Sequence, residues 1–559
     1  MPFRVLIVGS IVLAVCACLG GAMFLTLAPG DWTAAKAAML ASCLGAAPWV
    51  GFCAANGAIG FVLRLPRPTL PPSPVFQGAL PPTAIALTVR NEDMHLVLPP
   101  VRRLLEGLDA AGVGDAFALF VLSDTNDRLD AEQHAVASFR AALMDPGRIH
   151  YRHRKANTGF KAGNIMDFLD NHANGFELML ILDADSDMAP AAVLRLVTAM
   201  RDDPALGIIQ HLTVGLPASS AFPRLFQFGM RAGMRTWATA LSWWQADECV
   251  YWGHNAVVRI DPFRTHCRLP LLPNGEHILS HDQIEAAMLR GAGWGIRLLP
   301  EEDGSYEANP PALPEFMRRE LRWLAGNFEY RHLLGMPGLR LMGRWQLVQA
   351  ILLFGCTPFY ILFLLAAAWA AATDRNSPFP FMPALTATMI WAGALYAPKL
   401  LGYLEVFLSQ EKRTIYGGAG RMISGIVLET VFTLLLDAIN MVAKTIATAR
   451  IALGMRPQWM PQNRSDRGVS WLEATRLLWP QTIFGLLVFA GFAQSGWTAL
   501  VWAAPFSIGL ILAIPFCVLT ADPAVGAWLR EKRLAAIPEE LAIVARPTAG
   551  VTGGSALAS

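Results

Sequence analysis

The sequence predicts an α/β domain inserted into an α-helical transmembrane bundle of about six spans plus one interfacial helix. Three observations lead to this architecture. Hydrophobic residues make up 54% of the 559 residues and charged residues only 16%, against roughly a quarter in an average soluble domain. Uncharged stretches long enough to cross a bilayer recur near both ends of the chain. Between them, short apolar strands, such as 83–89 and 116–124, alternate with helical patterns, as in a mostly parallel sheet covered on both faces.

The overall composition excludes several classes of protein. The net charge of +2 at pH 7 gives no nucleic-acid footprint, so we expect no nucleic-acid partner. The eight cysteines are scattered, and none forms a CxxC pair or another metal-ligand spacing. We interpret them as buried thiols without a redox role. A mean hydropathy of +0.39 makes the lipid bilayer the expected partner.

Uncharged runs mark the expected spans, since about 20 apolar residues cross the hydrocarbon layer. The apolar core of the first run exceeds the roughly 7–15 residues of a secretory signal, and a second run follows at once, so we expect a retained anchor. The last run is long enough for two spans, with a break near "QSGW" at 494–497. Six crossings are expected in the runs 5–28, 37–63, 345–373, 376–398 and 477–521, the last counted twice.

Lysine and arginine collect on one side of these spans, which sets the orientation. They follow the second, fourth and sixth spans, at Arg64, Arg67, Lys412, Arg413, Arg421, Arg530, Lys532 and Arg533. We therefore expect a multi-pass protein of the cytoplasmic membrane whose long central segment is cytoplasmic. The expected units are 1–64 (two spans), 65–344 (cytoplasmic domain), 345–405 (two spans), 406–475 (interfacial helix and cytoplasmic loop), 476–522 (two spans) and 523–559 (cytoplasmic, disordered tail).

One apolar stretch does not fit this alternation of sides. Residues 422–444, "MISGIVLETVFTLLLDAINMVAK", are long enough to cross, yet both flanks are basic. Glu429 and Asp437 would be costly if they faced lipid. We therefore expect this segment to lie at the membrane interface, under the bundle.

Acidic residues gather where the expected strands of the cytoplasmic domain end. After the proline-rich linker "LPRPTLPPSP", "TVRNED" closes the first strand, "LSDTND" the second, and "LMLILDADSDM" stops at Asp183, Asp185 and Asp187. Ligands of parallel α/β sheets bind at the carboxyl ends of the strands. Carboxylates there suit a divalent cation that bridges to a diphosphate. A single such aspartate more often caps the following helix, so the prediction depends on three acidic strand ends together.

Two further motifs carry candidate chemistry. Asp282, in "ILSHDQIEAAMLRGAG", lies where a loop meets a helix and can act as a general base toward a sugar hydroxyl, or simply as a helix N-cap. "EFMRRELRWLAGNFEY" predicts an amphipathic helix with Arg319, Arg322 and Trp323 close together. Guanidinium groups suit a diphosphate leaving group, and we assign the tryptophan to a sugar ring. The alternative is a basic face turned to anionic lipid headgroups.

The segment 222–245, "FPRLFQFGMRAGMRTWATALSWWQ", is rich in aromatic residues and carries arginines on an amphipathic pattern. It can line a path for an acceptor or lie at the membrane interface. The alternative, that its aromatic residues belong to the core, is equally favoured by the pattern.

Taken in chain order, these motifs resemble the processive inverting family-2 glycosyltransferases. The matching residues are Asp124 in "LSDTND", Lys161 in "NTGFKAGN", Asp183 and Asp185 in "DADSD", Asp282 in "SHD", and Arg319-x-x-Arg322-Trp323. More narrowly, "YRHRKANTGFKAGNI", "GHNAVVR", "GSYEANPP" and "RELRWLAGN" are similar to the branch that makes osmoregulated periplasmic glucans. The resemblance spans residues from about 80 to about 470.

This resemblance implies a GT-A-like fold for the cytoplasmic domain. It also implies an inverting hexosyltransferase of the bacterial inner membrane that uses UDP-glucose as donor. The implied product is a β-glucan with a β-1,2-linked backbone, which is exported as it grows. A periplasmic partner that processes the glucan is a further implication.

The resemblance also implies a role for each matching residue. Substrate-binding roles fall on Glu92, Asp124, Lys161, Asp183, His254, Arg319, Arg322 and Trp323. Asp124 and Asp183 would hold the uridine and ribose, and Asp185, with Asp183, would ligate Mg²⁺ or Mn²⁺ on the diphosphate. Asp282 would be the catalytic base that deprotonates the acceptor hydroxyl.

The last motif completes the implied site. Arg319 and Arg322 would stabilise the departing diphosphate, and Trp323 would stack on the acceptor sugar. The chain departs from the family in three places. "TVRNED" lacks the tyrosine that commonly precedes the Asn-Glu pair, an arginine replaces the glutamine that begins the last motif of cellulose-type synthases, and "QWMPQNR" stands in place of their gating loop. Members of the branch are also expected to carry a longer amino-terminal region.

Two other functions remain open at this stage. One keeps the chemistry but transfers single sugars to a lipid carrier, without making a polymer. The other is a transporter or scaffold whose α/β domain only binds a nucleotide. Such a protein has no need for Asp282 together with the Arg-Trp cluster, so their joint presence favours an enzyme.

Overall fold

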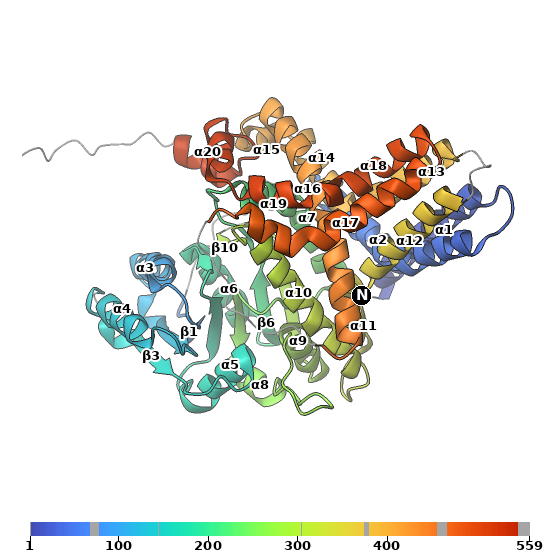
Figure 1. Ribbon diagram of the computed structural model, residues 1–559. Coiled ribbons are helices and arrows are strands. Elements are labelled where there is room, and N and C mark those ends of the chain that lie inside the picture. The colour runs from blue at the N-terminus through green and yellow to red at the C-terminus, as the bar shows by residue number, and fades with distance from the viewer. Residues whose placement is uncertain are drawn as a thin grey trace, which may run out of the picture.

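The computed structural model describes residues 2–66, 78–143, 145–302, 304–373, 379–455 and 467–545. Most of the proline-rich linker, the "QWMPQNR" segment and the end of the tail lie outside these residues. The ribbon has two parts, a sheet with helices on both faces and a bundle of long apolar helices (Figure 1).

A seven-stranded sheet forms the centre of the first part, in the order β3-β2-β1-β4-β8-β6-β9. Strands β3, β2, β1 and β4 are parallel, β8 is antiparallel to both neighbours, and β6 and β9 are parallel to each other. The predicted mostly parallel sheet is therefore confirmed. The strands are β1 Thr83–Val89, β2 Phe117–Ser123, β3 Ile149–His153, β4 Leu178–Asp183, β6 Leu206–His211, β8 Ala256–Arg259 and β9 Gly295–Leu299.

Helices cover both faces of this sheet, because its central strands are apolar on both sides. Ile85 and Leu87 of β1 belong to one core cluster, under α3 and α6, whereas Ala84 and Ala86 belong to another, with Phe168 of α5. The helices of this part are α3 Met94–Ala110, α4 Leu129–Ala141, α5 Phe160–Asn171, α6 Pro190–Asp202, α8 Ile260–His266 and α9 Asp282–Gly291, with 3-10 turns at Gly114–Ala116 and Pro146–Arg148. A small second sheet joins β5 Asp187–Met188, β10 Ser305–Glu307 and β7 Val214–Gly215.

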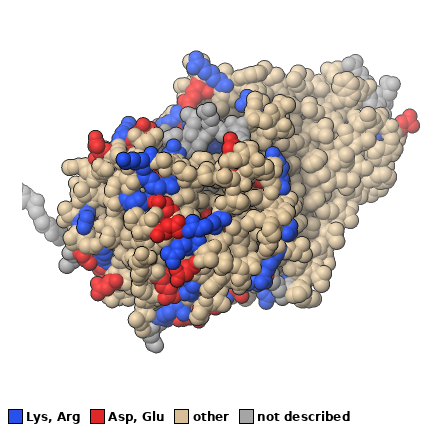
Figure 2. Space-filling model, turned by 90° about the horizontal axis from the view of Figure 1, so that it is seen from below, with Lys and Arg blue, Asp and Glu red and all other residues tan. Residues whose placement is uncertain are grey.

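Within the described residues, five helices are long and apolar enough to cross a membrane, or six if one bent pair counts as a span. They are α1 Pro2–Leu27, α2 Ala34–Arg64, α11 and α12 over Leu341–Thr373, α16 Ala419–Ala452, α17 Trp471–Ala493, and the bent pair α18 Trp497–Ile511 with α19 Ala513–Thr520. Charged side chains gather over one part of the molecule, and the other part is almost free of them on the face shown in Figure 2. This is the pattern of a multi-pass membrane protein.

Two segments differ from the expected set of spans. The helix expected at 376–398 is only 15 residues long, α13 Phe381–Leu395, and Pro398 near the start of α14 Ala397–Leu408 lies just past its end. Residues 422–444 lie within the single 34-residue helix α16. Its Glu429 is buried and pairs with a lysine of α14 at 2.6 Å, so one of the two charges that argued against crossing is neutralised. The interfacial placement of this segment stays a prediction.

Helices α7 Ala221–Gln245 and α10 Leu313–Glu329 connect the two parts. Helix α7 packs on α2, α14 and α16 of the bundle and on β9 of the sheet. Its Phe222 and Trp244 are at most 1% exposed, so these rings belong to the core, which was one of the two alternatives for this segment. Helix α10 packs on α16 and α11. The remaining short helices are Tyr330–His332, α15 Gln410–Ile415, α20 Pro523–Glu531 and α21 Pro538–Ala545.

Buried ion pairs fix α7 between the two parts. Arg231 contacts Glu302 at 3.0 Å, just before β10, and also Glu539 of α21. Arg235 contacts Glu302 at 3.5 Å and Glu405 of α14 at 2.8 Å. All the arginine side chains in these pairs are about as buried as core residues. A buried charge is strongly destabilising without its partner, so these contacts tie α7, α14 and α21 together.

Close packing of α2 against α7 gives a first testable prediction. A Cβ atom at Gly60 would lie 2.0 Å from the carbonyl oxygen of Thr236, so Gly60→Ala must push the two helices apart. We expect a loss of roughly 1–3 kcal/mol in unfolding free energy, as for other overpacked sites. Thermal unfolding in detergent measures it. The matched control is Gly9→Ala in α1, where an added Cβ meets nothing within 4 Å. Equal unfolding temperatures for the two variants would contradict the prediction.

Candidate active site

The carboxyl ends of β2 and β4 bring two of the predicted aspartates to one edge of the sheet. Strand β1 lies between them, with Val89 opposite Ser123 and Thr88 opposite Asp183. Asp124 follows directly, and its backbone N–H donates to the carbonyl of Val89 at 3.0 Å. The two carboxylates therefore flank the end of the same strand, as the sequence predicted.

Asp183 is paired with Lys161. Lys161 lies in the first turn of α5, directly after two residues with positive φ, the N-cap Gly159 at 71° and the first helical residue Phe160 at 55°. Its ammonium group contacts the Asp183 carboxylate and donates to the carbonyl of Gly253 at 2.8 Å. Three segments that are far apart in sequence thus meet at one lysine.

Asp282 borders the same point. Gly253 has φ +87°, and a Cβ placed on it would lie only 3.3 Å from the Cβ of Asp282. Glycine therefore meets two needs here, the left-handed backbone and the close approach of the aspartate. Asp282 is the first residue of α9, but the preceding residue is the N-cap and makes no side-chain capping bond. The capping alternative for Asp282 accordingly has no support in the hydrogen bonds of this helix.

His281, the neighbour of Asp282, is held by a residue one turn later. Its Nδ1 lies 2.9 Å from Oε2 of Glu285, and both side chains are largely buried. Burial by itself lowers the pKa of His281, yet the Glu285 carboxylate leaves it above its ordinary value. The Glu285 carboxylate is thus the group that holds the His281 ring beside the candidate base.

His254 and Glu307 form a second pair at this edge. His254 Nε2 lies 3.5 Å from Oε2 of Glu307, which is contributed by β10. Burial raises the pKa of Glu307, and the carboxylates of Asp185 and Asp183 raise it further. His254 and Arg319 act in the opposite direction and lower the pKa. The Glu307 carboxyl group is therefore within electrostatic range of Asp183 and Asp185. His254 was predicted as a substrate-binding residue, whereas Glu307 was given no role, although "GSYEANPP" contains it.

Arg319 and Trp323 lie together on α10. The Arg319 guanidinium carbon is 4.6 Å from the centre of the Trp323 ring, and it also faces Phe226 and Phe316. Arg319 is 9% exposed, and its Nε is buried with no hydrogen-bond partner among the described residues. Trp323 is 42% exposed, and Arg322 lies between them in sequence with intermediate exposure. A buried cation beside an exposed ring suits an anionic group next to a sugar.

Asp124 has a partner that the sequence analysis missed. Arg154 donates from Nε and Nη2 to the two carboxylate oxygens of Asp124, both at 2.7 Å. The same guanidinium also bonds the carbonyls of Thr158 and Phe160, both at 3.1 Å. It therefore ties Asp124 to the loop that precedes Lys161. The only signal in the sequence was the basic run of "YRHRKANTGFKAGNI".

Two of the predicted acidic residues, Asp187 and Glu92, are not members of the ion pairs described above for this site. Asp187 pairs with Arg103 of α3 at 2.7 Å and takes part in the small second sheet, so it does not share the site. Glu92 lies in the turn after β1 with intermediate exposure. The preceding Asn91, at φ 57°, accepts the backbone N–H groups of Asn126 and Asp127 at 3.0 and 2.9 Å. This joins the ends of β1 and β2, and the substrate-binding role of Glu92 stays a prediction.

The residues present fit a divalent cation that is held partly by the protein and partly by a diphosphate. None of the aspartates after β4 caps α6, whose N-cap is Ala189 without a side-chain bond, so helix capping does not account for them. No group of three or more potential ligands is clustered within the described residues. Mg²⁺ commonly takes only one or two carboxylates and completes its shell with water and substrate phosphates. Asp185 and Asp183 offer that number.

Comparison with known proteins agrees with this geometry. The model for "Glycosyl transferase family 2" matches residues 87–267, and that for "Glycosyl transferase family group 2" matches residues 178–398. Glucans biosynthesis glucosyltransferase H of Vibrio cholerae serotype O1 is 33% identical over 516 residues, or 88% of this chain and 71% of the relative. The protein of that name from Bradyrhizobium diazoefficiens is 34% identical over 530 residues, or 90% and 70%.

A solved structure also shows a loose similarity. A mannosyltransferase of Pyrobaculum calidifontis, in complex with GDP-Man and Mn²⁺, matches 71% of this chain and 98% of its own with a TM-score of 0.43 and 15% identity. A similarity at that level carries no argument about substrate or metal.

The mixed sheet and the matching family models define a family-2 glycosyltransferase with a GT-A-like catalytic domain. This confirms the fold class and the class of enzyme expected from the motifs. The chain belongs to the glucans biosynthesis glucosyltransferase H family.

Proposed function

We propose that this protein polymerises glucose from UDP-glucose into a β-glucan with a β-1,2-linked backbone, of the osmoregulated periplasmic kind. The observation that supports this most is the meeting of Lys161, Asp183 and Asp282 at Gly253, on the edge of the sheet that also holds Asp124. The relatives named for glucan biosynthesis support the choice of product.

The proposed reaction is a single in-line displacement. Asp282 takes the proton of an acceptor hydroxyl, and the acceptor oxygen attacks the anomeric carbon of the donor glucose. The bond from that carbon to UDP breaks, UDP leaves with the bonding electron pair, and the configuration is inverted. Arg319 and Arg322 neutralise charge on the departing diphosphate. Trp323 stacks on the acceptor glucose.

Binding of the donor falls to the strand-end residues. Asp124 and Asp183 hold the uridine and ribose, and Lys161 faces the diphosphate. Asp185, with Asp183, would hold Mg²⁺ or Mn²⁺, and the bound cation would neutralise charge that develops on the leaving group. His254, which lies 3.5 Å from Glu307, contacts the donor sugar in this proposal.

Export is proposed because the catalytic part is joined to the bundle through α10. Glu320, next to Arg319, forms an ion pair with Lys444 of α16 at 2.7 Å. A sugar added near Trp323 is therefore close to α16, a helix long and apolar enough to span the membrane. We propose that the catalytic domain is cytoplasmic, that the bundle lies in the bacterial inner membrane, and that a periplasmic partner processes the product.

The test is a reconstitution assay. Purified protein in liposomes is incubated with radiolabelled UDP-glucose and Mg²⁺, and the linkage of any polymer is determined. A β-1,2-linked ladder supports the proposal. Labelled lipid without polymer would favour the transferase that acts on a lipid carrier, and no turnover with any nucleotide sugar would favour binding or transport alone.

A further inference from the structure

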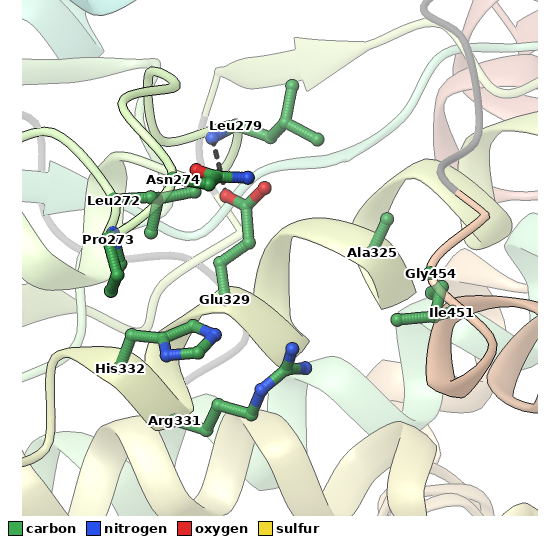
Figure 3. A pocket seen from close by; sticks show the side chains of 10 residues that line it. All are labelled: Leu272, Pro273, Asn274, Leu279, Ala325, Glu329, Arg331, His332, Ile451 and Gly454. Carbon is green, nitrogen blue, oxygen red and sulfur yellow. Dashed lines mark hydrogen bonds between the residues drawn. The ribbon is translucent and has the colours of Figure 1, made fainter.

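The end of α10 reaches the loop that carries Asp282. Glu329 is the last residue of α10, and its Oε2 accepts the backbone N–H of Leu279 at 2.8 Å (Figure 3). Leu279 is three residues before Asp282, and the same helix carries Arg319 and Trp323. One hydrogen bond thus connects the helix of the leaving-group residues to the loop of the candidate base.

Two neighbours of Glu329 contact the same loop. A Cβ atom on Gly326 would lie 2.5 Å from Oγ and 3.0 Å from the backbone N of Ser280, so helix and loop are in direct contact. Tyr330 is fully buried, and the carboxylates of Asp282 and Glu285 add to burial in raising the pKa of its hydroxyl. The loop is therefore held against α10 at successive residues.

A glutamate is an unfavourable choice for this end of a helix. The carboxyl end of a helix carries partial negative charge and favours basic residues. Burial raises the pKa of Glu329 to about 7, although the N–H of Leu279 and the charge of Arg331 both lower it. The ionised form of Glu329 is therefore energetically unfavourable here. Helix stability alone does not account for Glu329, whereas its bond to the loop does.

Glu329 also lines a cavity of about 270 Å³. Besides Glu329, the charged and titratable residues of its wall are Arg331 and His332, in the turn that follows α10 (Figure 3). The loop side contributes Leu272, Pro273, Asn274 and Leu279, and α16 and its end contribute Ile451 and Gly454, none of which titrates.

We propose that Glu329 is a positioning residue that holds the loop 279–282, and with it Asp282, in register with Arg319 and Trp323 of α10. This inference rests on the proposed function, since it concerns the alignment of acceptor, base and leaving group. Misplacement of a reacting group by about 1 Å can cost a hundredfold in rate, so a single loop contact has a measurable effect.

The strength of the hydrogen bond between Glu329 and Leu279 depends on pH in a defined direction. Above about pH 7 the carboxylate makes a charge-assisted bond to Leu279, and below it the neutral acid makes a weaker one. Turnover should therefore fall on the acid side with a midpoint near pH 7. Stability changes in the opposite sense: because the folded pKa is raised, the stabilisation from the protonated form is complete below the ordinary glutamate pKa and is lost as the pH rises through about 7.

Glu329→Ala, Glu329→Gln and His332→Ala test the proposal in liposomes. The alanine variant should lower kcat about tenfold with KM for UDP-glucose within about twofold, and amide exchange at residues 276–284 should accelerate about tenfold. The glutamine variant keeps a neutral acceptor, so it should retain about a third of the rate at pH 8 and lose the acid limb. His332→Ala changes the same cavity wall but removes no hydrogen bond between the described residues and the loop 279–282, so it should match wild type.

Wild-type kcat or unchanged amide exchange in Glu329→Ala would overturn the proposal, as would an acid limb retained in Glu329→Gln. A glutamine variant as impaired as the alanine variant would overturn it as well, because the acceptor is then not what matters. Failure of the proposed function has a different signature: the wild-type protein then turns over no nucleotide sugar, while amide exchange still reports whether Glu329 holds the loop.

Discussion

Replacing Asp282 by asparagine is expected to lower glucan synthesis about a thousandfold while UDP binding stays within about twofold of wild type. Asparagine has nearly the same size, but it cannot take the proton of the acceptor hydroxyl. Asp282 borders Gly253 and does not touch Lys161 through any described hydrogen bond, so the donor residues should stay in place. The measurement pairs steady-state turnover of radiolabelled UDP-glucose with calorimetric binding of UDP.

A matched control separates this effect from loss of fold. Asp261 of α8 forms an exposed ion pair with Arg264, with an 82% exposed carboxylate. Asp261→Asn should keep wild-type turnover, because such surface pairs contribute little. Turnover in Asp282→Asn within tenfold of wild type would exclude it as the base and shift attention to the buried pair of His281 and Glu285.

Replacing Asp185 by asparagine should lower turnover about a hundredfold and raise the concentration of Mg²⁺ or Mn²⁺ needed for half-maximal activity at least tenfold. The substitution removes one of the two carboxylates available to a cation on the diphosphate, and removing a charged ligand weakens such a site. Metal titration of activity measures the shift. A second readout is the metal dependence of UDP binding, which needs no turnover.

The adjacent Asp187 provides the control for this prediction. It is two residues from Asp185 but pairs with Arg103 of α3 and stands outside the site. Asp187→Asn should therefore leave the metal requirement unchanged. If both variants shift the metal requirement equally, the effect is one of general charge and the assignment of Asp185 is wrong.

The sequence predicted the sheet well because local pattern determines it. Strand β1 was expected at 83–89 and is Thr83–Val89, since an apolar run with flanking turn residues has few alternatives. The edge where Asp124 and Asp183 meet followed from the rule that ligands bind at the carboxyl ends of parallel strands. Helix α13 was harder, because a break near Pro398 decides its length and hydropathy alone ignores it.

The partners of the site residues were not predictable in the same way. Arg154 and Glu307 are separated from Asp124 and His254 by 30 and 53 positions, and only the folded chain brings each pair together. Asp187 looked equivalent to Asp183 in the sequence, yet a short strand turns it toward Arg103. The type and spacing of the residues thus indicated where the candidate active site lies. Tertiary contacts decided which carboxylates belong to it.

The buried ion pairs of α7 bear on how this enzyme can be divided for laboratory work. A fragment confined to the catalytic domain would keep Arg231 and Arg235 but lose Glu405 of α14 and Glu539 of α21. Two guanidinium groups would then share the single carboxylate of Glu302, and part of their counter-charge would be missing. Expression trials are better served by the full chain in detergent or nanodiscs than by excision of the sheet domain, and carboxyl-terminal tags belong after α21.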